Sequence, residues 1–318
     1  NFALGKLYYS MMESYAEPRL SNLEAADRDT YRLRLQLSPL EKCNLIAFLE
    51  YNNRPENRTY LYDYYSDNCA TRLRDSYAYV SSGDFRKWAE AEKTGQTLRD
   101  STIRCLSPVF LADWAINYLL GPSVDKEITL WEAMFLPDML RIGIEKFQKS
   151  ESTMLYSASS QRNELPISVF YIKTAAMSLI LVLIILMTRS KHAAIQRTGD
   201  IISALIYLIF FIMSAILLFF ETATIHKVTY FNTSILVISP VAIVLSALHI
   251  SAAVKSSSRK RIRKLCTALL IFTSALLFLK LLLIRLFYIG NWAYYIVIIP
   301  VYAAECISPC RTRSRVHR

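Results

Sequence analysis

A cysteine in the N-terminal half of the chain stands where a helix start can make a thiol reactive. Asp67 and Asn68 are residue types that cap helix N-termini, and Cys69 would be the first residue of the helix that follows. The unpaired backbone N–H groups and the positive end of the helix dipole at that position favour the thiolate over the thiol. The same N–H groups can stabilise the oxyanion of an acyl intermediate. These residues therefore permit nucleophilic catalysis by Cys69.

Polar side chains on both sides of this cysteine could assist it. Arg72 and Arg74 lie within two turns and would add positive potential if they fold toward the thiol. Asp67, Asn68 and Asp75 can orient a base, or they can simply cap and pair within the helix. A structural interpretation stands beside the catalytic one: a small buried cysteine, next to arginines that form a solvated or ion-paired face. The local sequence leaves both interpretations open.

Two strands and two helices are predicted to position the cysteine. Tyr31–Leu37 alternates apolar and polar residues, as a half-buried strand does. Ser38-Pro39-Leu40-Glu41 is a capping box that begins a helix running to about Tyr51. Arg58–Ser66 is rich in tyrosine and predicts a second strand. Cys69 then begins the second helix, which Ser81-Ser82-Gly83 closes.

The remainder of the N-terminal half is predicted to be helical, near residues 84–92, 101–120 and 130–147. A polar, serine-rich stretch follows it and is typical of a linker. We therefore expect three parts: an exported domain over residues 1–148, a linker over 149–165, and a transmembrane domain over 166–318.

The C-terminal half has the composition of a membrane domain. Residues 166–318 carry 17 Lys and Arg and 3 Asp and Glu, whereas residues 1–165 carry 20 and 23. The basic residues stand in short segments between apolar runs, unlike the basic surface of a nucleic-acid-binding protein. Each run approaches the ~20 residues that cross a ~30 Å hydrocarbon core. The five runs are Ser168–Thr188, Ile201–Phe220, Ser234–Val254, Leu265–Ile289 and Trp292–Pro309.

The basic segments also predict an orientation. The segments after the first and third runs, together with the tail, hold 13 Lys and Arg, whereas Lys227 stands alone between the second and third runs. The positive-inside rule places the 13 in the cytoplasm and the N-terminal domain on the other side. Lys280 and Glu221 are predicted within or at the ends of spans, either paired with each other or reaching toward the interface.

Histidine and cysteine usage limits the chemistry. The four histidines are His192, His226, His249 and His317, so the N-terminal half has none. A zinc site there is therefore not expected, and we expect no cofactor. Cys43, Cys69 and Cys105 give that half an odd number of cysteines, which leaves at least one thiol unpaired if all partners are local.

The residues around Cys69 resemble a known family. Tyr62-Asp-Tyr-Tyr-Ser-Asp-Asn-Cys-Ala-Thr-Arg-Leu-Arg-Asp75 is similar to the signature of the Lnb-type lipoprotein N-acyltransferases. The resemblance covers most of residues 1–149, and a C-terminal half with several spans is also typical of the family. Further segments follow the family's order: Gly5–Tyr9, Leu37–Pro39, Arg54–Arg58, Thr97–Arg99 and Met134–Asp138.

The resemblance implies an α+β fold: a permuted papain-like exported domain, truncated at its N-terminus, followed by an all-α bundle of about five transmembrane helices. It implies that Cys69 takes an acyl chain from a membrane phospholipid as a thioester and passes it to the N-terminal amine of a lipoprotein. Asp67 and Asn68 would accompany Cys69 in catalysis, and Arg72, Arg74 and Asp75 would act electrostatically or on the substrate. The implied location is the bacterial inner membrane, with the N-terminal domain periplasmic and the tail cytoplasmic.

The family's base is the histidine of a Gly-His motif, and no residue of this chain matches it. The motif would precede Asn1, and an exported domain also needs a signal peptide, so we expect further N-terminal residues in the complete protein. His226 is the one histidine predicted near the outer face. Two other functions remain open: a membrane-anchored periplasmic cysteine peptidase or amidase, and a truncated relative that binds lipids or partners without turnover. Nucleic acid is not an expected partner.

Overall fold

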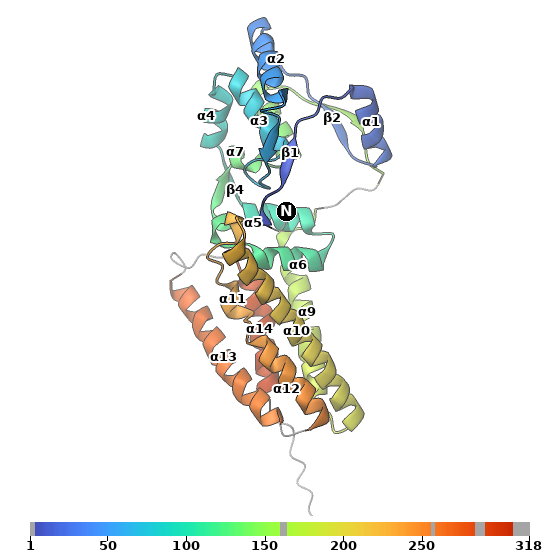
Figure 1. Cartoon of the computed structure of the whole chain (residues 1–318), viewed down its shortest axis with the longest axis vertical. Coiled ribbons are helices and arrows are strands. Elements are labelled where there is room, and N and C mark those ends of the chain that lie inside the picture. Colours follow the sequence, from blue (N-terminus) through green and yellow to red (C-terminus); the bar gives the residue numbers. More distant parts are fainter. Residues whose placement is uncertain (1–3, 160–163, 256–257, 284–289, 308–318) are drawn as a thin grey trace, which may run out of the picture. The chain divides into compact units, whose positions relative to one another are not determined.

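The computed structural model describes residues 4–159, 164–255, 258–283 and 290–307. It divides into two compact units (Figure 1). The N-terminal unit comprises Asn1–Ser101 and Lys126–Glu164, and the helical unit comprises Thr102–Asp125 and Leu165–Arg318. The division differs from the domains expected from sequence, because residues 102–125 group with the apolar C-terminal helices.

The described strands of the N-terminal unit form three separate two-stranded antiparallel sheets. The strands are shorter than predicted: residues 33–37 and 62–66 lie outside them, although Asp63 and Asp67 form an isolated bridge. One strand lies inside the expected linker, where it pairs with a strand near residue 31. The pairs are β1 (Tyr8–Ser10) with β3 (Thr59–Leu61), β2 (Thr30–Arg32) with β6 (Thr153–Tyr156), and β4 (Lys93–Thr97) with β5 (Glu127–Thr129).

Local signals placed the helix starts well. The predicted capping box is present at Ser38, whose N–H donates to Glu41 Oε2 at 2.7 Å while its Oγ accepts from Glu41 N at 3.3 Å. The helices predicted near residues 101–120 and 130–147 are each divided into two shorter helices, at Pro108 and at Pro137. The helices are α1 (Ala16–Ala25), α2 (Pro39–Asn53), α3 (Cys69–Val80), α4 (Asp84–Ala91), α5 (Leu98–Leu106), α6 (Phe110–Leu119), α7 (Leu130–Ala133) and α8 (Pro137–Gln148).

The core of the N-terminal unit is aromatic and lies among α3, α4, α7 and α8. Phe85 is fully buried, and its ring meets those of Tyr77, Trp131 and Phe147 at centroid distances of 4.9, 6.2 and 5.3 Å. Met134, also fully buried, completes this cluster. Because α3 contributes to this core along its length, the core fixes the helix that begins at Cys69.

Within the described residues, the helical unit has four helices long and apolar enough to cross a membrane. They are α9 (Ile167–Met187), α10 (Ala193–Ala223), the Ser234–Val254 segment that holds α11 (Ser234–Val237) and α12 (Ala242–Val254), and α13 (Arg259–Leu282). The fifth predicted run contains α14 (Trp292–Cys306), whose 15 residues fall short of the ~20 of a full span. The predicted cytoplasmic tail after Pro309 lies outside the described residues.

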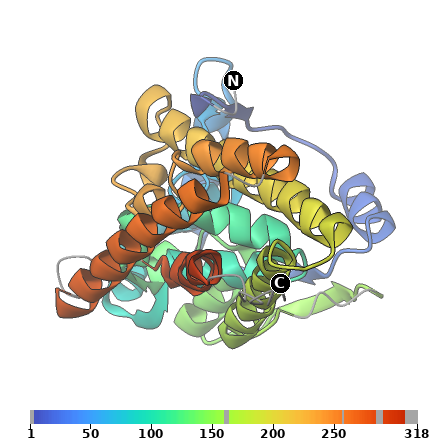
Figure 2. The same ribbon diagram turned by 90° about the horizontal axis from the view of Figure 1, so that it is seen from below.

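The short helix α14 runs through the middle of the bundle, packed against α9 and α13 (Figure 2). Its residues Val297, Ile298 and Val301 are fully buried. Residues 102–125 also join this unit through polar contacts. Tyr294 Oη donates to the Trp114 carbonyl at 3.0 Å, and Tyr118 Oη donates to the Ile238 carbonyl at 2.9 Å.

Lys280 and Glu221 do not form the pair considered from sequence; each contacts other groups in the helical unit. The Lys280 ammonium donates to Asn291 Oδ1 and lies 4.1 Å from the centre of the Trp292 ring. Glu221 Oε1 accepts from the Asn232 backbone N–H at 2.7 Å. Both charges therefore have local partners at one end of the bundle.

Candidate functional site

Cys69 is the first residue of α3, as predicted, and its side chain is exposed. Asn68 is the N-cap: its Oδ1 accepts from Ala70 N at 2.8 Å and from Thr71 N at 2.9 Å. The cap is reciprocal, because Asn68 N donates to Thr71 Oγ1 at 2.7 Å. The cap thus occupies two first-turn N–H groups that sequence reasoning assigned to an oxyanion. The N–H of Cys69 is the first-turn donor that the cap does not use.

The other end of the Asn68 carboxamide holds two loops. Its Nδ2 donates to the carbonyls of Tyr64 and Phe135, both at 2.9 Å. Asn68 is buried, with 7% of its surface exposed. It therefore fixes the start of α3 against the turn before it and the segment before α8, and its contacts are structural.

Two tyrosines of the segment before α3, Tyr60 in β3 and Tyr62 just after it, lie near the thiol. Tyr60 Oη lies 4.0 Å from Cys69 Sγ. Burial, followed by the charge of Cys69 and of Asp67, raises the pKa of the Tyr60 phenol to about 12, so the hydroxyl keeps its proton at neutral pH. Tyr62 lies beside it, stacked on Tyr9 of β1 with ring centres 4.6 Å apart. Tyr60 is thus a hydrogen-bond donor within reach of a thiolate.

An arginine holds Tyr60 in place. The Arg72 guanidinium carbon lies 4.1 Å from the centre of the Tyr60 ring. The same guanidinium binds Asp67 in a bidentate pair, with Nε–Oδ1 at 2.5 Å and Nη2–Oδ2 at 2.7 Å. Asp67, Arg72, Tyr60 and Cys69 therefore form one continuous chain of contacts, in which Asp67 orients the arginine.

Arg74 and Asp75 contact the core and each other. The guanidinium of Arg74 lies 3.9 Å from the centre of the Trp131 ring, and its Nη1 donates to the Trp131 carbonyl at 3.0 Å. Arg74 Nε donates to Asp75 Oδ1 at 2.9 Å. Of the two arginines predicted near the thiol, the structure thus brings Arg72 to the tyrosine beside Cys69 and packs Arg74 against α7.

Residues 4–106 match the family model of the Lnb N-terminal periplasmic domain. This part of the chain is similar to that domain. The match covers Asp67, Cys69, Arg72 and Tyr60, so the whole chain of contacts lies inside the matched residues. No curated protein and no solved structure matches the chain.

Residues 1–164 contain no histidine, so none of them matches the histidine base that the resemblance implies. The described histidines are His192, His226 and His249, and all belong to the helical unit. Among the residues that the structure describes, no group of three or more His, Cys, Asp or Glu could hold a metal ion. Among the described residues that match the family model, the Tyr60 phenol contacts Cys69, and the Arg72–Asp67 pair lies against that phenol.

Sequence reasoning missed Tyr60. The residues before Cys69 predicted a strand, and residues two apart on a strand share a face. That period places Tyr60 and Tyr62 on one side of the strand. Pairing of Tyr9 with Tyr60 in the β1–β3 register then gathers the tyrosines of both strands. The alternation was a usable signal, whereas the pairing with β1 was not visible in the sequence.

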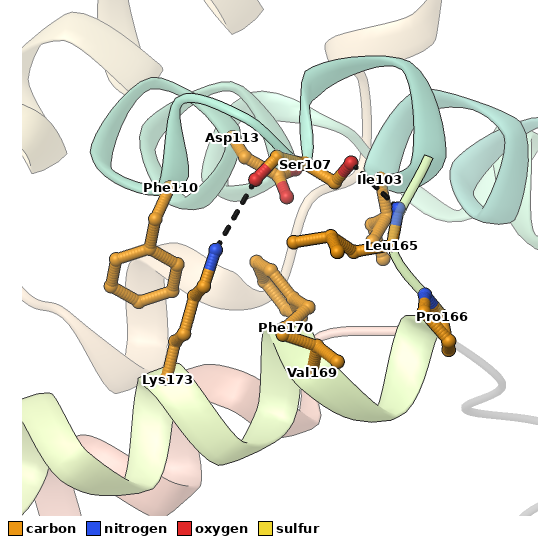
Figure 3. A pocket seen from close by; sticks show the side chains of 9 residues that line it. All are labelled: Ile103, Ser107, Phe110, Asp113, Leu165, Pro166, Val169, Phe170 and Lys173. Atoms are coloured by element: carbon orange, nitrogen blue, oxygen red, sulfur yellow. Dashed lines mark hydrogen bonds between the residues drawn. The ribbon is translucent and has the colours of Figure 1, made fainter. Parts of the chain in front are cut away.

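A small cleft in the helical unit is lined by two ionisable side chains, Asp113 and Lys173 (Figure 3). Lys173 Nζ reaches across it to donate to the Ser107 carbonyl at 3.3 Å, and Leu165 N donates to Ser107 Oγ at 3.1 Å. Asp113, 1% exposed, accepts from Asn117 Nδ2 at 2.6 Å. Burial raises the pKa of Asp113 to about 7, against the opposing effects of Asn117 and Lys173.

Cys69 is expected to be the most reactive of the three N-terminal cysteines. All three are exposed, but Cys43 lies inside α2 and Cys105 near the C-terminal end of α5. Only Cys69 has a helix N-terminus to stabilise its thiolate. Competitive alkylation at pH 7, read by mass spectrometry, should label Cys69 at least several-fold faster. Equal rates at the three sites would remove the chemical basis of this site.

Tyr60→Phe tests the phenol in the same assay. A hydrogen bond to a charged group contributes roughly 1.5 kcal/mol, so its loss should slow alkylation of Cys69 by about tenfold. Tyr62→Phe, which removes a neighbouring hydroxyl from the same strand, is the matched control and should leave the rate nearly unchanged. Equal rates in the two variants would contradict the assignment of Tyr60.

Asp113→Asn should change how stability depends on pH. The raised pKa means that the folded protein retains a proton between about pH 4 and 7 that the unfolded chain releases. This group therefore lowers the stability of the fold as pH rises through that window. The introduced carboxamide would keep an acceptor for Asn117 without the charge, so the variant should melt at a higher temperature than the parent at pH 8. Asp84→Asn, at an exposed carboxylate, is the control; identical pH profiles for Asp113→Asn and the parent would contradict the prediction.

Proposed function

We propose that this chain is part of a membrane-bound acyltransferase that moves a fatty acyl chain from a phospholipid to the N-terminal amine of a lipoprotein through a thioester on Cys69. The observation that carries the proposal is the placement of an exposed thiol at the first residue of α3, 4.0 Å from a protonated phenol, in a domain similar to the Lnb N-terminal periplasmic domain. Four membrane-type helices in the same chain keep such a domain at a lipid surface. A permuted papain-like arrangement is part of the proposal.

In the first step, the Cys69 thiolate attacks the ester carbonyl of the phospholipid. The C–S bond forms and the ester C–O bond breaks, and the base returns the proton it took from the Cys69 thiol to the leaving oxygen, so that the lysophospholipid departs as an alcohol. The Cys69 N–H, which the Asn68 cap leaves unused, would donate to the oxyanion. Tyr60 would stabilise the thiolate before attack and after its release.

In the second step, the acceptor amine attacks the thioester carbonyl. The C–N bond forms, the C–S bond breaks, and the amine proton passes to the base, so that an amide and the free thiol result. The base would be the histidine of the Gly-His motif that the family resemblance implies. Asp67 and Arg72 are positioning residues here, whereas Asn68, Arg74 and Asp75 hold the scaffold.

A cysteine peptidase or amidase is the alternative that keeps the thiol chemistry. It would use the same acyl intermediate and release it to water or a peptide amine. A chain that binds lipids or partners without turnover is the other alternative. The extended run of apolar helices favours a substrate drawn from the bilayer over a soluble peptide.

We further propose that the protein lies in the bacterial inner membrane with its Lnb domain periplasmic and its C-terminal tail cytoplasmic. The support is the asymmetry of Lys and Arg between the two sets of loops. The crossing by α14 is part of this proposal, because that helix has 15 residues and lies among longer helices.

Replacement of the nucleophile tests the activity. In the complete protein, Cys69→Ser should abolish formation of triacylated lipoprotein while the protein still folds and enters the membrane, because a hydroxyl at this position is far harder to ionise than a thiol. Asp67→Ala and Arg72→Ala should give partial losses, since they act through Tyr60. Without acceptor, a phospholipid-derived acyl chain should accumulate on Cys69 and be released by hydroxylamine. If no thioester forms and Cys69→Ser changes nothing, the non-catalytic alternative is correct.

Reporter fusions test the orientation. Alkaline phosphatase fused after Glu151 should be active, because that site is predicted to be periplasmic. A reporter that works only in the cytoplasm should be active after Arg318. An inactive phosphatase at the first site would overturn the orientation, and an inactive second reporter would show that α14 does not cross.

A further inference from the structure

One end of the helical bundle gathers five charged or titratable side chains from different elements, and three of them are buried. It is the end where α9 and α12 finish, α10 and α13 begin, and α14 finishes. Asp200 and Glu305 have no exposed surface, and His249 is 1% exposed. Arg189 and Arg259 complete the group. These residues are in the helical unit and take no part in the thiol chemistry proposed for the Lnb domain.

The histidine lies between the two carboxylates. His249 Nδ1 is 3.2 Å from Asp200 Oδ1, and His249 Nε2 is 3.0 Å from Glu305 Oε1. The Tyr207 ring stacks on the imidazole, with centres 5.5 Å apart and planes inclined by 17°. This stacking and the two nitrogen contacts hold the ring in one orientation.

Each carboxylate already has an arginine. Arg259 forms a fork on Asp200, with Nη2 on Oδ2 and Nη1 3.3 Å from Oδ1, and Nη1 also donates to the Thr188 carbonyl at 2.8 Å. Arg189 Nη2 donates to Glu305 Oε2 at 3.1 Å and to the Glu305 carbonyl at 2.7 Å. The two ion pairs balance without any charge on the histidine.

A neutral imidazole cannot satisfy both of its contacts. It carries one N–H, so its other nitrogen would present a lone pair to a carboxylate oxygen about 3 Å away. With the N–H on Nδ1, the atoms left without a hydrogen-bond partner are His249 Nε2 and Glu305 Oε1, both buried. Two unsatisfied acceptors facing each other away from water are strongly unfavourable. One additional proton between them removes the conflict.

We propose that this cluster is a proton-binding site, in which His249 is held as an imidazolium between Asp200 and Glu305. The bound proton then joins α12 to α10 through one nitrogen and to α14 through the other. Among the described residues, Tyr207 from α10, Cys266 from α13 and Tyr302 from α14 are further titratable side chains near the cluster, and all three are buried. Cys306, next to Glu305, is partly buried. The proton therefore acts as a latch on the last turn of α14.

The site predicts how the bundle responds to pH. Removal of the proton leaves Nε2 and Glu305 Oε1 as facing acceptors, so the packing of α14 at this end weakens at alkaline pH. Glu305→Gln offers a neutral amide N–H to the ring instead, and the neutral imidazole can then satisfy both contacts. That variant should hold its ring with a single proton.

Nitrogen-15 NMR of the full chain in lipid nanodiscs tests the site directly. His192→Gln, His226→Gln and His317→Gln leave His249 as the one histidine of the chain. At pH 7, both ring nitrogens should show the shifts of an imidazolium, and Glu305→Gln in this background should convert them to those of a neutral ring. Glu221→Gln, at a carboxylate bound to Asn232 N, is the matched control and should leave the imidazolium unchanged.

A neutral ring in the parent at pH 7 would overturn the proposal, as would an unchanged imidazolium in Glu305→Gln. A second measurement does not depend on the triple replacement. The melting temperature of the unmodified chain should fall from pH 7 to pH 9, and the fall should be lost in His249→Gln. Equal pH dependence in the two proteins would contradict the latch.

Discussion

The described site depends on the four hydrogen bonds of the Asn68 carboxamide. The carboxamide accepts two hydrogen bonds from the first turn of α3 and donates two to the carbonyls of Tyr64 and Phe135. Serine and aspartate also cap helices, but neither has an amide that could donate to both carbonyls. Replacement by alanine would lose the cap, worth about 1 kcal/mol, and leave a buried carbonyl of the segment before α8 unsatisfied. The position of Cys69 is therefore fixed by contacts of Asn68 with a residue that precedes Cys69 in the chain and with one that follows it.

The hydrogen bonds from the first turn of α3 to Asn68 have a chemical consequence for the site. A helix N-terminus stabilises a thiolate or an oxyanion through N–H groups that have no other partner. Here the cap takes two of them and leaves the Cys69 N–H, so side chains must supply part of the stabilisation. Tyr60 and Arg72 supply it, and their positions follow from the β1–β3 register and from the bidentate pair with Asp67. The thiol environment is thus built by residues that surround the helix start in space as well as by the helix itself.

The sequence predicted features that depend on residues close together in the chain, and it did not predict contacts between residues far apart in the chain. The capping box at Ser38 and the cap at Asn68 connect residues three apart, and both helix starts were correctly predicted. The contact from Asn68 to Phe135 spans 67 residues, and that from Arg74 to Trp131 spans 57, so no local pattern indicates them. The grouping of residues 102–125 with the apolar helices is of the same kind, since it rests on contacts such as that of Tyr118 with Ile238. Local sequence patterns predict turns and helix caps, whereas contacts between distant residues depend on which side chains are buried together in the folded protein.

The helical unit applies the same constraint in an apolar setting. At about 1.5 Å per residue, the 15 residues of α14 extend over roughly 22 Å, less than the ~30 Å of a hydrocarbon core. Its two ends are polar and must find partners among neighbouring helices, because a buried polar group without a partner is costly. Asn291, at the N-cap, binds Lys280 of α13, and Glu305, in the last turn, meets Arg189 and His249. Two polar anchors at opposite ends of one apolar helix fix its position along the bundle, which apolar packing alone does not specify. The polar and charged groups buried in this unit therefore determine the position of α14 along the bundle. These residues are unfavourable to bury without partners, and their partners are available at one position of the helix only.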